Sequence, residues 1–324
     1  MRPRDFLLPL AILLLVLVGC PTGDDDDSAV GDDDDTTEPC EPGDGESTDA
    51  QWVEVAAGLA HTCSRNLDGL MQCWGWEDDS QLSVPINVVA ATIAVGGRHS
   101  CALQDDGETR CWGLNISAQA TPPGTVFDSL AAGTYHTCGL TEEGVAECWG
   151  RNDHGQTDVP EAVVFTQLDG GEYHTCGLVD DGSVQCWGDD EYGQSTPPAE
   201  IFTQISAGKW HSCGVAGDGS VSCWGYDGDG QVSAPGGSYT QVEAGGEHSC
   251  AIAADGHLEC WGCGTHDFGQ CDPPDREFSH LAVGENHGCA SSTASYVLCW
   301  GSGLSACDCS PAELLWECGQ GDPM

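Results

Sequence analysis

Histidine and cysteine recur in this sequence at fixed distances from each other, and both residue types can ligate metals or act in catalysis. A histidine stands two residues before the first cysteine of a pair, the second cysteine follows ten residues later, and Trp-Gly comes next. The pattern occurs seven times, with successive copies 37 to 39 residues apart. The histidines are His61, His99, His136, His174, His211, His248 and His287. The cysteine pairs are Cys63/Cys73, Cys101/Cys111, Cys138/Cys148, Cys176/Cys186, Cys213/Cys223, Cys250/Cys260 and Cys289/Cys299. The tryptophans are Trp74, Trp112, Trp149, Trp187, Trp224, Trp261 and Trp300.

The spacing of these cysteines favours disulfides over a metal site. Zinc ligands within a pair are usually two to four residues apart, and two pairs or a pair and histidines converge on one ion. Here each pair spans ten residues and has a repeat of its own. In a hairpin that turns at Asp68-Gly69, Cys63 and Cys73 would lie opposite each other, close enough to bond. We therefore predict one disulfide in each repeat, each contributing roughly 2.5–3 kcal/mol through a short closed loop, and no metal or cofactor.

Each repeat has the pattern of short β-strands joined by tight turns. It opens with an aromatic and an aliphatic residue three apart, as in Phe165-Thr-Gln-Leu168, and continues through glycine to the histidine. A turn that often reads Asp-Gly follows, which is a strong hairpin signal between two strand-like runs. A polar loop, often ending in Gly-Gln, leads to the next repeat. No helical periodicity follows the first 20 residues, so the sequence predicts an all-β array of identical units.

Charge and cysteine content restrict the partners and the compartment. The chain has 8 Lys and Arg against 53 Asp and Glu, a formal net charge of -45. Such a surface repels polyanions, which disfavours nucleic acid as a partner. Of the 21 cysteines, 14 fall in regular pairs, which is typical of a protein that folds in an oxidising compartment.

The first 50 residues are predicted to deliver and tether the protein. Residues 1–20 have a basic start and an apolar run from Leu7 to Val18, and their end at Cys20 resembles a bacterial lipobox. This resemblance implies a lipid on Cys20, with an ordinary secretory signal as the alternative. Residues 21–50 carry two runs of four aspartates and nothing to bury, so we expect a disordered acidic tether, because the calcium-loop spacing is missing.

The repeat G-x-x-H-T/S-C-A-L, D-G-x-x-x-C-W-G, G-Q resembles that of the RCC1 (regulator of chromosome condensation) family, with cysteine in place of two aliphatic residues. The resemblance covers about residues 51–318 and implies a seven-bladed β-propeller, followed by a tail at 319–324. Family activities include nucleotide exchange on a small GTPase with chromatin binding, which the export signal and the negative charge argue against here. Secreted β-lactamase-inhibitory propellers are also similar, and they bind a protein through aromatic loop residues on one face.

Six cysteines lie outside the seven pairs and the leader. Cys263 and Cys271 share the long loop of the sixth repeat and are predicted to pair. Cys40 lies near one end of the ring, and Cys307, Cys309 and Cys318 lie near the other. A closed ring of blades needs its ends joined, so we expect one of these three to bond Cys40. The segment from Pro311 resembles the start of an eighth repeat, and an extra terminal strand is the other means of closure.

Residues at fixed repeat positions are predicted to be structural. The histidines precede Thr or Ser in most repeats, and we expect them to hydrogen-bond within their own blade and hold its turn. The tryptophans are predicted to pack between blades. The two residues between glycine and histidine vary, and we expect them on one face of the propeller. They supply the predicted partner-binding residues Arg98, Tyr135, Tyr173, Lys209 and Trp210. The alternative is that these rings merely cover the turns beneath them.

No catalytic motif occurs, so an enzyme is not predicted. The function predicted from the sequence is that of a monomeric lipoprotein of the bacterial outer membrane or cell surface. It would contact the membrane only through its lipid and bind a protein or peptide through one propeller face. The alternatives are a carboxylate-based hydrolase or lyase acting on envelope polysaccharide or peptide, and a structural envelope component. A pair of carboxylates near the axis with a raised pKa would favour the enzyme, whereas a flat aromatic patch would favour the binding protein.

Overall fold

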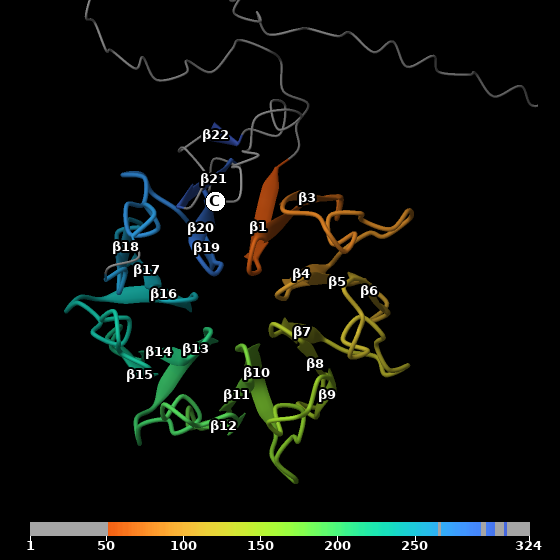
Figure 1. Cartoon of the computed structure of the whole chain (residues 1–324), viewed down its shortest axis with the longest axis horizontal. Helices are drawn as coiled ribbons and strands as arrows, with labels where there is room; N and C mark the ends of the chain where they lie inside the picture. The colour runs from red at the N-terminus through yellow and green to blue at the C-terminus, as the bar shows by residue number, and fades with distance from the viewer. Residues whose placement is uncertain (1–50, 265–266, 293–295, 302–307, 310–324) are drawn as a thin grey trace, which may run out of the picture. The chain divides into compact units, whose positions relative to one another are not determined.

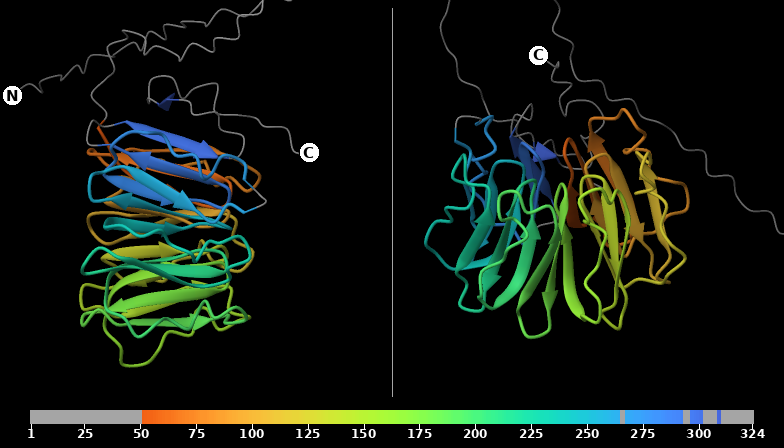
Figure 2. Two further views of the ribbon diagram at one scale, coloured as in Figure 1. Left: turned by 90° about the vertical axis from the view of Figure 1, so that its left-hand side faces the viewer. Right: turned by 60° about the horizontal axis from the view of Figure 1, so that its bottom comes forward.

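The computed structural model describes residues 51–264, 267–292, 296–301 and 308–309. The chain divides into a unit of residues 1–45 and a compact unit of residues 46–324, and all described residues belong to the second. Their strands form seven antiparallel sheets arranged as blades around an axis (Figure 1). In the side view the strands run between two faces of this ring (Figure 2). The all-β seven-bladed propeller is therefore confirmed.

Each blade consists of an inner, a middle and an outer strand that follow one another in sequence. The inner strands, nearest the axis, are β1 (Trp52–Ala57), β4 (Thr92–Val95), β7 (Ser129–Ala132), β10 (Phe165–Gly170), β13 (Phe202–Ala207), β16 (Tyr239–Ala244) and β19 (His280–Val283). The middle strands are β2 (His61–Asn66), β5 (His99–Leu103), β8 (His136–Leu140), β11 (His174–Val179), β14 (His211–Ala216), β17 (Ser249–Ala253) and β20 (His287–Ser291). The outer strands are β3 (Met71–Gly75), β6 (Thr109–Gly113), β9 (Ala146–Gly150), β12 (Val184–Gly188), β15 (Val221–Gly225), β18 (Leu258–Trp261) and β21 (Val297–Gly301).

The ring closes where the first blade packs against the last. Strand β1 lies against β19 and β20 without joining their sheet. An extra strand, β22 (Asp308–Cys309), pairs with the outer edge of β21 rather than with β1. The predicted bond from Cys40 to Cys307, Cys309 or Cys318 and the eighth repeat from Pro311 lie outside the residues whose side chains are described. Packing between β1 and the last blade thus closes the ring in the part that is described.

The hairpin register brings the repeat cysteines together, as predicted. In all seven blades the cysteine of the middle strand lies directly opposite the cysteine of the outer strand. The turn glycine allows this register, since Gly144 adopts φ +77°, which side chains rarely tolerate. The Cα atoms of each pair are 4.0–4.1 Å apart, and every predicted repeat disulfide is confirmed. The bonds are Cys63–Cys73, Cys101–Cys111, Cys138–Cys148, Cys176–Cys186, Cys213–Cys223, Cys250–Cys260 and Cys289–Cys299.

An eighth disulfide joins Cys263 to Cys271 in the long loop of the sixth blade, which confirms that prediction as well.

The two cysteines of each repeat disulfide differ in burial, a difference that their regular spacing in the sequence does not predict. The middle-strand cysteine is fully buried in every blade. Six of the outer-strand partners are only half-buried, namely Cys73, Cys111, Cys148, Cys186, Cys223 and Cys260. The outer strand is the edge of its sheet, and in the last blade, where β22 covers that edge, Cys299 is buried too.

The hydrophobic core lies between neighbouring blades. Cys138 and Leu140 of the third blade pack with Phe165, Leu168 and Trp187 of the fourth. The same arrangement recurs between the fourth blade and the fifth. This confirms that the repeat tryptophans pack between blades. Since each blade buries its apolar side chains against the next, the core exists only when blades stack.

The repeat histidines connect adjacent blades, and the prediction that they bond within their own blade is wrong. Nε2 of His136 lies 2.8 Å from Oγ1 of Thr175 in the next blade. The hydroxyl of Thr175 donates its proton to the carbonyl of Gln156, which also accepts the indole N–H of Trp187. Because that proton is used, Nε2 of His136 is the donor. Six of the seven histidines contact a hydroxyl of the following blade in this way, including His287, which reaches the first blade.

The histidine of the sixth blade, His248, is the exception to these contacts between blades. His248 has no hydroxyl partner among the described residues, because the last blade carries Gly288 where the others carry Ser or Thr. A side chain at Gly288 would lie 2.3 Å from the ring of Trp300, its cross-strand partner. The indole therefore occupies the space that a hydroxyl fills in the other blades.

Candidate functional site

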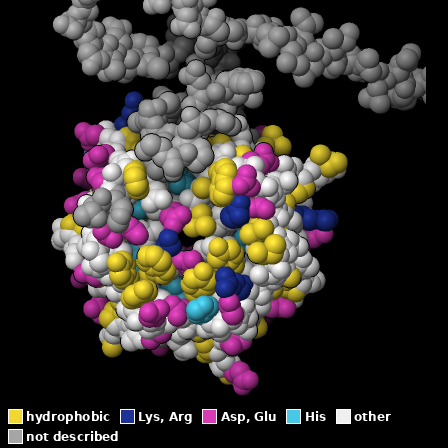
Figure 3. All heavy atoms as spheres, viewed as in Figure 1, with side chains coloured by type: hydrophobic (Ala, Val, Ile, Leu, Met, Phe, Trp, Pro, Cys, Tyr) yellow, Lys and Arg dark blue, Asp and Glu magenta, His cyan; other side chains and the backbone are white. Residues whose placement is uncertain are grey.

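Two sets of loops meet on one face of the propeller, which we call the upper face. The inner and outer strands of a blade both end there, so the inner-to-middle turn lies beside the loop that leaves the outer strand. Backbone hydrogen bonds join the two, as from Arg151 N to Tyr135 O at 2.9 Å and from Tyr226 N to Trp210 O at 2.9 Å. Figure 3 shows this face, with hydrophobic and acidic side chains around a central opening and basic groups between them.

The two variable residues of each turn have different surroundings. The first residue lines a pocket on the propeller axis, as Thr134, Glu172 and Lys209 do. The second residue, such as Tyr135 or Tyr173, meets the side chains of the neighbouring loop. Because the first residue of each turn lines the pocket and the second follows it directly, the rings at the second position lie at the rim of the axial pocket.

Tyr135 and Tyr173 form one aromatic group, which we call the Tyr173 cluster. Their ring centroids are 6.2 Å apart and the rings are stacked. His154 stacks on Tyr173 at 4.7 Å, and the guanidinium of Arg151 lies 5.2 Å from Tyr135 and 5.1 Å from Tyr173. The cluster therefore combines two turns with the loop between them, which holds Arg151 and His154.

Trp210 belongs to a second group, the Trp210 cluster, formed with Tyr192 and Tyr226. The ring of Tyr192 lies 5.0 Å from Tyr226 and 6.2 Å from Trp210, and Trp210 lies 5.6 Å from Tyr226. The rings meet at steep angles and 43% of Tyr192 is exposed, so the cluster forms an apolar ledge. Lys209 places its ammonium 4.5 Å from the centroid of the Trp210 ring.

Arg98, the fifth predicted site residue, lies with other neighbours. Its guanidinium covers Trp76 at 4.4 Å and pairs with Asp78 and Asp79 at 3.3 and 3.0 Å. The structure thus brings Tyr135 and Tyr173 together, places Lys209 beside Trp210, and puts Arg98 in a separate contact.

Five residues of the upper face were missed from the sequence. They are Trp76, Arg151, His154, Tyr192 and Tyr226. All five lie in the loops that leave the outer strands after Trp-Gly. An aromatic or basic residue within four positions of Trp-Gly was the available signal. From the sequence alone these Asp- and Gly-rich loops are interpreted as turns, with calcium coordination as the alternative.

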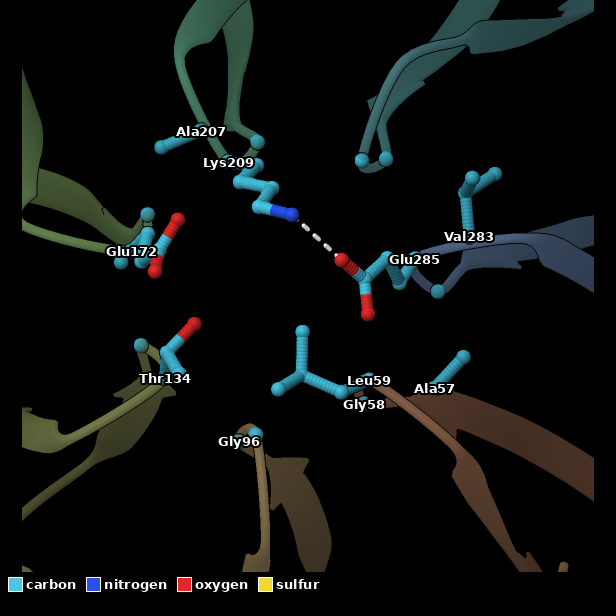
Figure 4. Close-up of a pocket in the computed structure, with 18 of the residues that line it drawn as sticks. Ala57, Gly58, Leu59, Gly96, Thr134, Glu172, Ala207, Lys209, Val283 and Glu285 are labelled. Carbon is cyan, nitrogen blue, oxygen red and sulfur yellow. Dashed lines mark hydrogen bonds and ion pairs between the residues drawn. The ribbon is translucent and has the colours of Figure 1, made fainter. Parts of the chain in front are cut away.

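The axial pocket is lined by the glycine-rich turns of all seven blades. Figure 4 shows Lys209 and Glu285 reaching toward each other across it, with Glu172 and Thr134 beside them. Lys209 forms an ion pair with Glu285. Burial raises the pKa of Glu172, an effect that its contact with Tyr173 and the nearby Lys209 oppose.

Two pairs of carboxylates lie near the axis. Glu172 and Glu285 share the pocket, but its volume of about 70 Å³ is several times smaller than the hundreds of Å³ of typical ligand sites. Asp169 and Glu243 lie on the inner strands, where burial raises their pKa values to about 6 and about 8. Both accept scaffold hydrogen bonds, Asp169 from Ala207 N at 2.7 Å and Glu243 from Ser206 Oγ at 3.1 Å.

The described residues hold neither a metal-binding cluster nor a membrane-spanning helix. No group of three or more His, Cys, Asp or Glu side chains in these ranges is placed to hold a metal ion. Within the same residues, no helix is long and apolar enough to cross a membrane.

Comparison with known proteins agrees with this architecture. The family profile described as "Regulator of chromosome condensation (RCC1) repeat" matches residues 90–119, 127–156, 165–194, 202–231 and 239–270. These five matches coincide with consecutive blades of the ring. The chain belongs to the RCC1 repeat family.

Several solved structures are similar to it over most of the chain. The ectodomain of the receptor kinase CR4 of Physcomitrella patens is 26% identical, covering 79% of this chain and 75% of that one, with a TM-score of 0.67. The CRINKLY WD40 ectodomain of the Arabidopsis thaliana receptor kinase ACR4 is 25% identical, covering 79% of this chain and all of that one, with a TM-score of 0.65. Prp20p of Saccharomyces cerevisiae, described with its binding to Gsp1p and histones, is 18% identical over 78% and 83%, with a TM-score of 0.60. A search of curated proteins found no match.

Proposed function

We propose that this RCC1-repeat protein is a surface lipoprotein that binds a protein or peptide through its upper face. The observation that carries the proposal is the pair of clusters around Tyr173 and Trp210, which gather partly exposed rings from consecutive blades and their loops on one face. Tyrosine, tryptophan and arginine are the residue types that dominate binding hot spots. If the rings only covered their own turns, they would not also contact side chains of the loops that leave the outer strands, as Tyr173 contacts His154.

The disulfides and the leader support the proposed location. Eight disulfides require an oxidising compartment. The apolar run from Leu7 to Val18 ends at Cys20, and residues 21–50 are acidic and polar. A lipid on Cys20 would hold the propeller at the bacterial outer membrane or cell surface through the acidic segment that follows it. The similar plant receptor domains are ectodomains, which fits a propeller that works outside the cell.

Similar propellers also include protein binders. Prp20p is described with its binding to Gsp1p and histones, and yeast RCC1 was solved bound to Kap60. These partners belong to those proteins. What carries over to this chain is the use of an RCC1-like propeller as a rigid platform for another macromolecule.

The binding proposal is favoured over a carboxylate enzyme. The axial carboxylates are the feature that would favour catalysis, but Glu285 is engaged by Lys209, and the pocket is several times smaller than typical ligand sites. Asp169 and Glu243, whose pKa values are raised, accept hydrogen bonds from the scaffold. The aromatic clusters, by contrast, are accessible at the rim. A purely structural envelope component would have no dedicated partner, and the capture experiment below distinguishes it.

Substituting the rings tests the binding face. In pull-downs from the native envelope, a full-length variant with Tyr135→Ala, Tyr173→Ala and Trp210→Ala should lose the captured partner while its melting temperature stays unchanged. Loss of hot-spot rings typically costs at least about 2 kcal/mol, or roughly 30-fold in Kd. The matched control replaces exposed Val126, Val145 and Val164 by alanine and should retain capture. Equal capture by both variants would contradict the proposal.

Replacing Cys20 tests the anchor. Cells that express the wild-type chain and are fed an alkyne fatty acid should label it, and the protein should sediment with membranes. The variant Cys20→Ala should lose both properties, because it lacks the only thiol proposed to carry lipid. Labelling of Cys20→Ala at the wild-type level would show that the anchor is elsewhere or that the leader is an ordinary secretory signal.

A further inference from the structure

Among the described residues of the upper face, each basic side chain that contacts an aromatic ring is also paired with a carboxylate. Arg98 forms ion pairs with Asp78 and Asp79, and Arg151 donates two hydrogen bonds of 2.7 and 2.6 Å to Asp153. Lys209 bonds Glu285. Among the residues that the structure describes, these three are the Lys and Arg side chains that contribute to those contacts. The basic groups that could meet an acidic partner are therefore committed.

The acidic groups of the face are in excess. Glu172 lies in the axial pocket with Lys209 and Glu285, giving two carboxylates to one ammonium. Loop residues Asp189, Asp190 and Glu191 add negative charge between the two clusters. A surface with this balance attracts cations and repels anions, in keeping with the net charge of -45.

One oxygen of Glu172 is placed to receive a donor from outside. Oε2 of Glu172 is buried and accepts no well-aligned hydrogen bond from the residues that the structure describes, and the hydroxyl of the adjacent Tyr173 is the donor near this carboxylate. Figure 4 shows the carboxylate directed toward the open centre of the pocket. Glu172 directly precedes Tyr173, and Lys209 directly precedes Trp210, so the pocket opens between the two clusters. A pocket of about 70 Å³ has room for the end of one side chain.

We propose that the partner presents a lysine or arginine side chain to the axial pocket, where its cation bonds Glu172 beside Glu285. The clusters around Tyr173 and Trp210 contact the peptide on either side of that residue. Their rings also attract a cation through their π faces, as they attract Arg151 and Lys209 within the chain. This inference rests on the proposed function, because it assigns the chemistry of the partner at the same face.

An octapeptide array of basic, neutral and acidic sequences tests the inference, with the full-length protein as the probe at physiological salt. The best-bound peptides should contain lysine or arginine. Their affinity should fall about tenfold with Glu172→Gln, the loss expected for one partly buried ion pair. The control Glu143→Gln makes the same charge change on the exposed β8–β9 hairpin of the opposite face and should leave affinity unchanged. Replacing the peptide lysine by norleucine should remove the difference between wild type and Glu172→Gln.

Several outcomes would overturn the inference: selection of neutral or acidic peptides, equal weakening by Glu172→Gln and Glu143→Gln, or no bound basic peptide. The variant with Tyr135, Tyr173 and Trp210 replaced by alanine separates the two proposals. If that variant fails to capture the envelope partner while Glu172→Gln captures it normally, the binding face stands and the basic side chain is wrong. If the ring variant captures it normally, the proposed function itself fails.

Discussion

Mild acid should unfold this propeller, because its seven repeat histidines are buried as neutral rings. Burial lowers their pKa values from 6.5 to about 3 or about 4, and neighbouring histidines lower several of them further. The unfolded chain therefore binds more protons than the folded chain below pH 6.5. The stability that these rings contribute is complete above that pH, and it is lost progressively as the pH falls toward the folded values.

The expected loss is as large as the stability of a typical domain. Between pH 7 and pH 5 each ring removes about 2 kcal/mol from the free energy of unfolding, and all seven remove roughly 13 kcal/mol. Asp169 and Glu243 act in the opposite direction, because their raised pKa values of about 6 and about 8 favour the folded state as they protonate. Their protonation therefore offsets part of the loss over the same interval. The loss from the histidines is comparable with the usual total stability of about 5–15 kcal/mol.

Urea unfolding at pH 7, 6 and 5 measures this loss, with tryptophan fluorescence as the signal and the disulfides intact. The slope of the unfolding free energy against pH reports the number of protons taken up, which should reach several per molecule near pH 5. A loss of less than about 3 kcal/mol between pH 7 and 5 would refute the claim that the neutral histidine ring holds the blades together.

Two further predictions concern one hydroxyl contact between blades and one repeat disulfide. Ser212→Ala should lower the free energy of unfolding by about 1–3 kcal/mol, because it removes a buried hydroxyl that bonds both His174 and the carbonyl of Gln194. Ser222→Ala, at an exposed hydroxyl of β15, should change it by less than about 0.5 kcal/mol, and similar effects of both substitutions in urea unfolding would contradict the assigned role. Replacing Cys138 and Cys148 by alanine should cost about 2.5–3 kcal/mol. Non-reducing peptide mapping should then show the other repeat disulfides unchanged, and a wild-type bond from Cys138 to any cysteine except Cys148 would disprove the hairpin register.

The proposed binding face was only partly predictable from the sequence. Tyr135, Tyr173 and Trp210 could be found because they vary at a position that is otherwise framed by glycine and histidine. The partners that make them clusters, such as Arg151 and Tyr192, lie in loops of irregular sequence with no repeated frame. Only the structure, in which each inner-to-middle turn lies beside a loop that leaves an outer strand, shows that these residues meet.

The sequence by itself determined the blades: their number, their three-stranded hairpin pattern and the disulfide across each hairpin. These features depend on short distances along the chain, where ten residues and an Asp-Gly turn leave one register. The tertiary structure decided what happens between blades. His136 bonds Thr175 rather than its own turn, and Glu172 faces the axis while Tyr173 faces a loop. Such contacts depend on the angle at which successive blades stack around a closed ring, and that angle is set by packing between residues nearly forty positions apart.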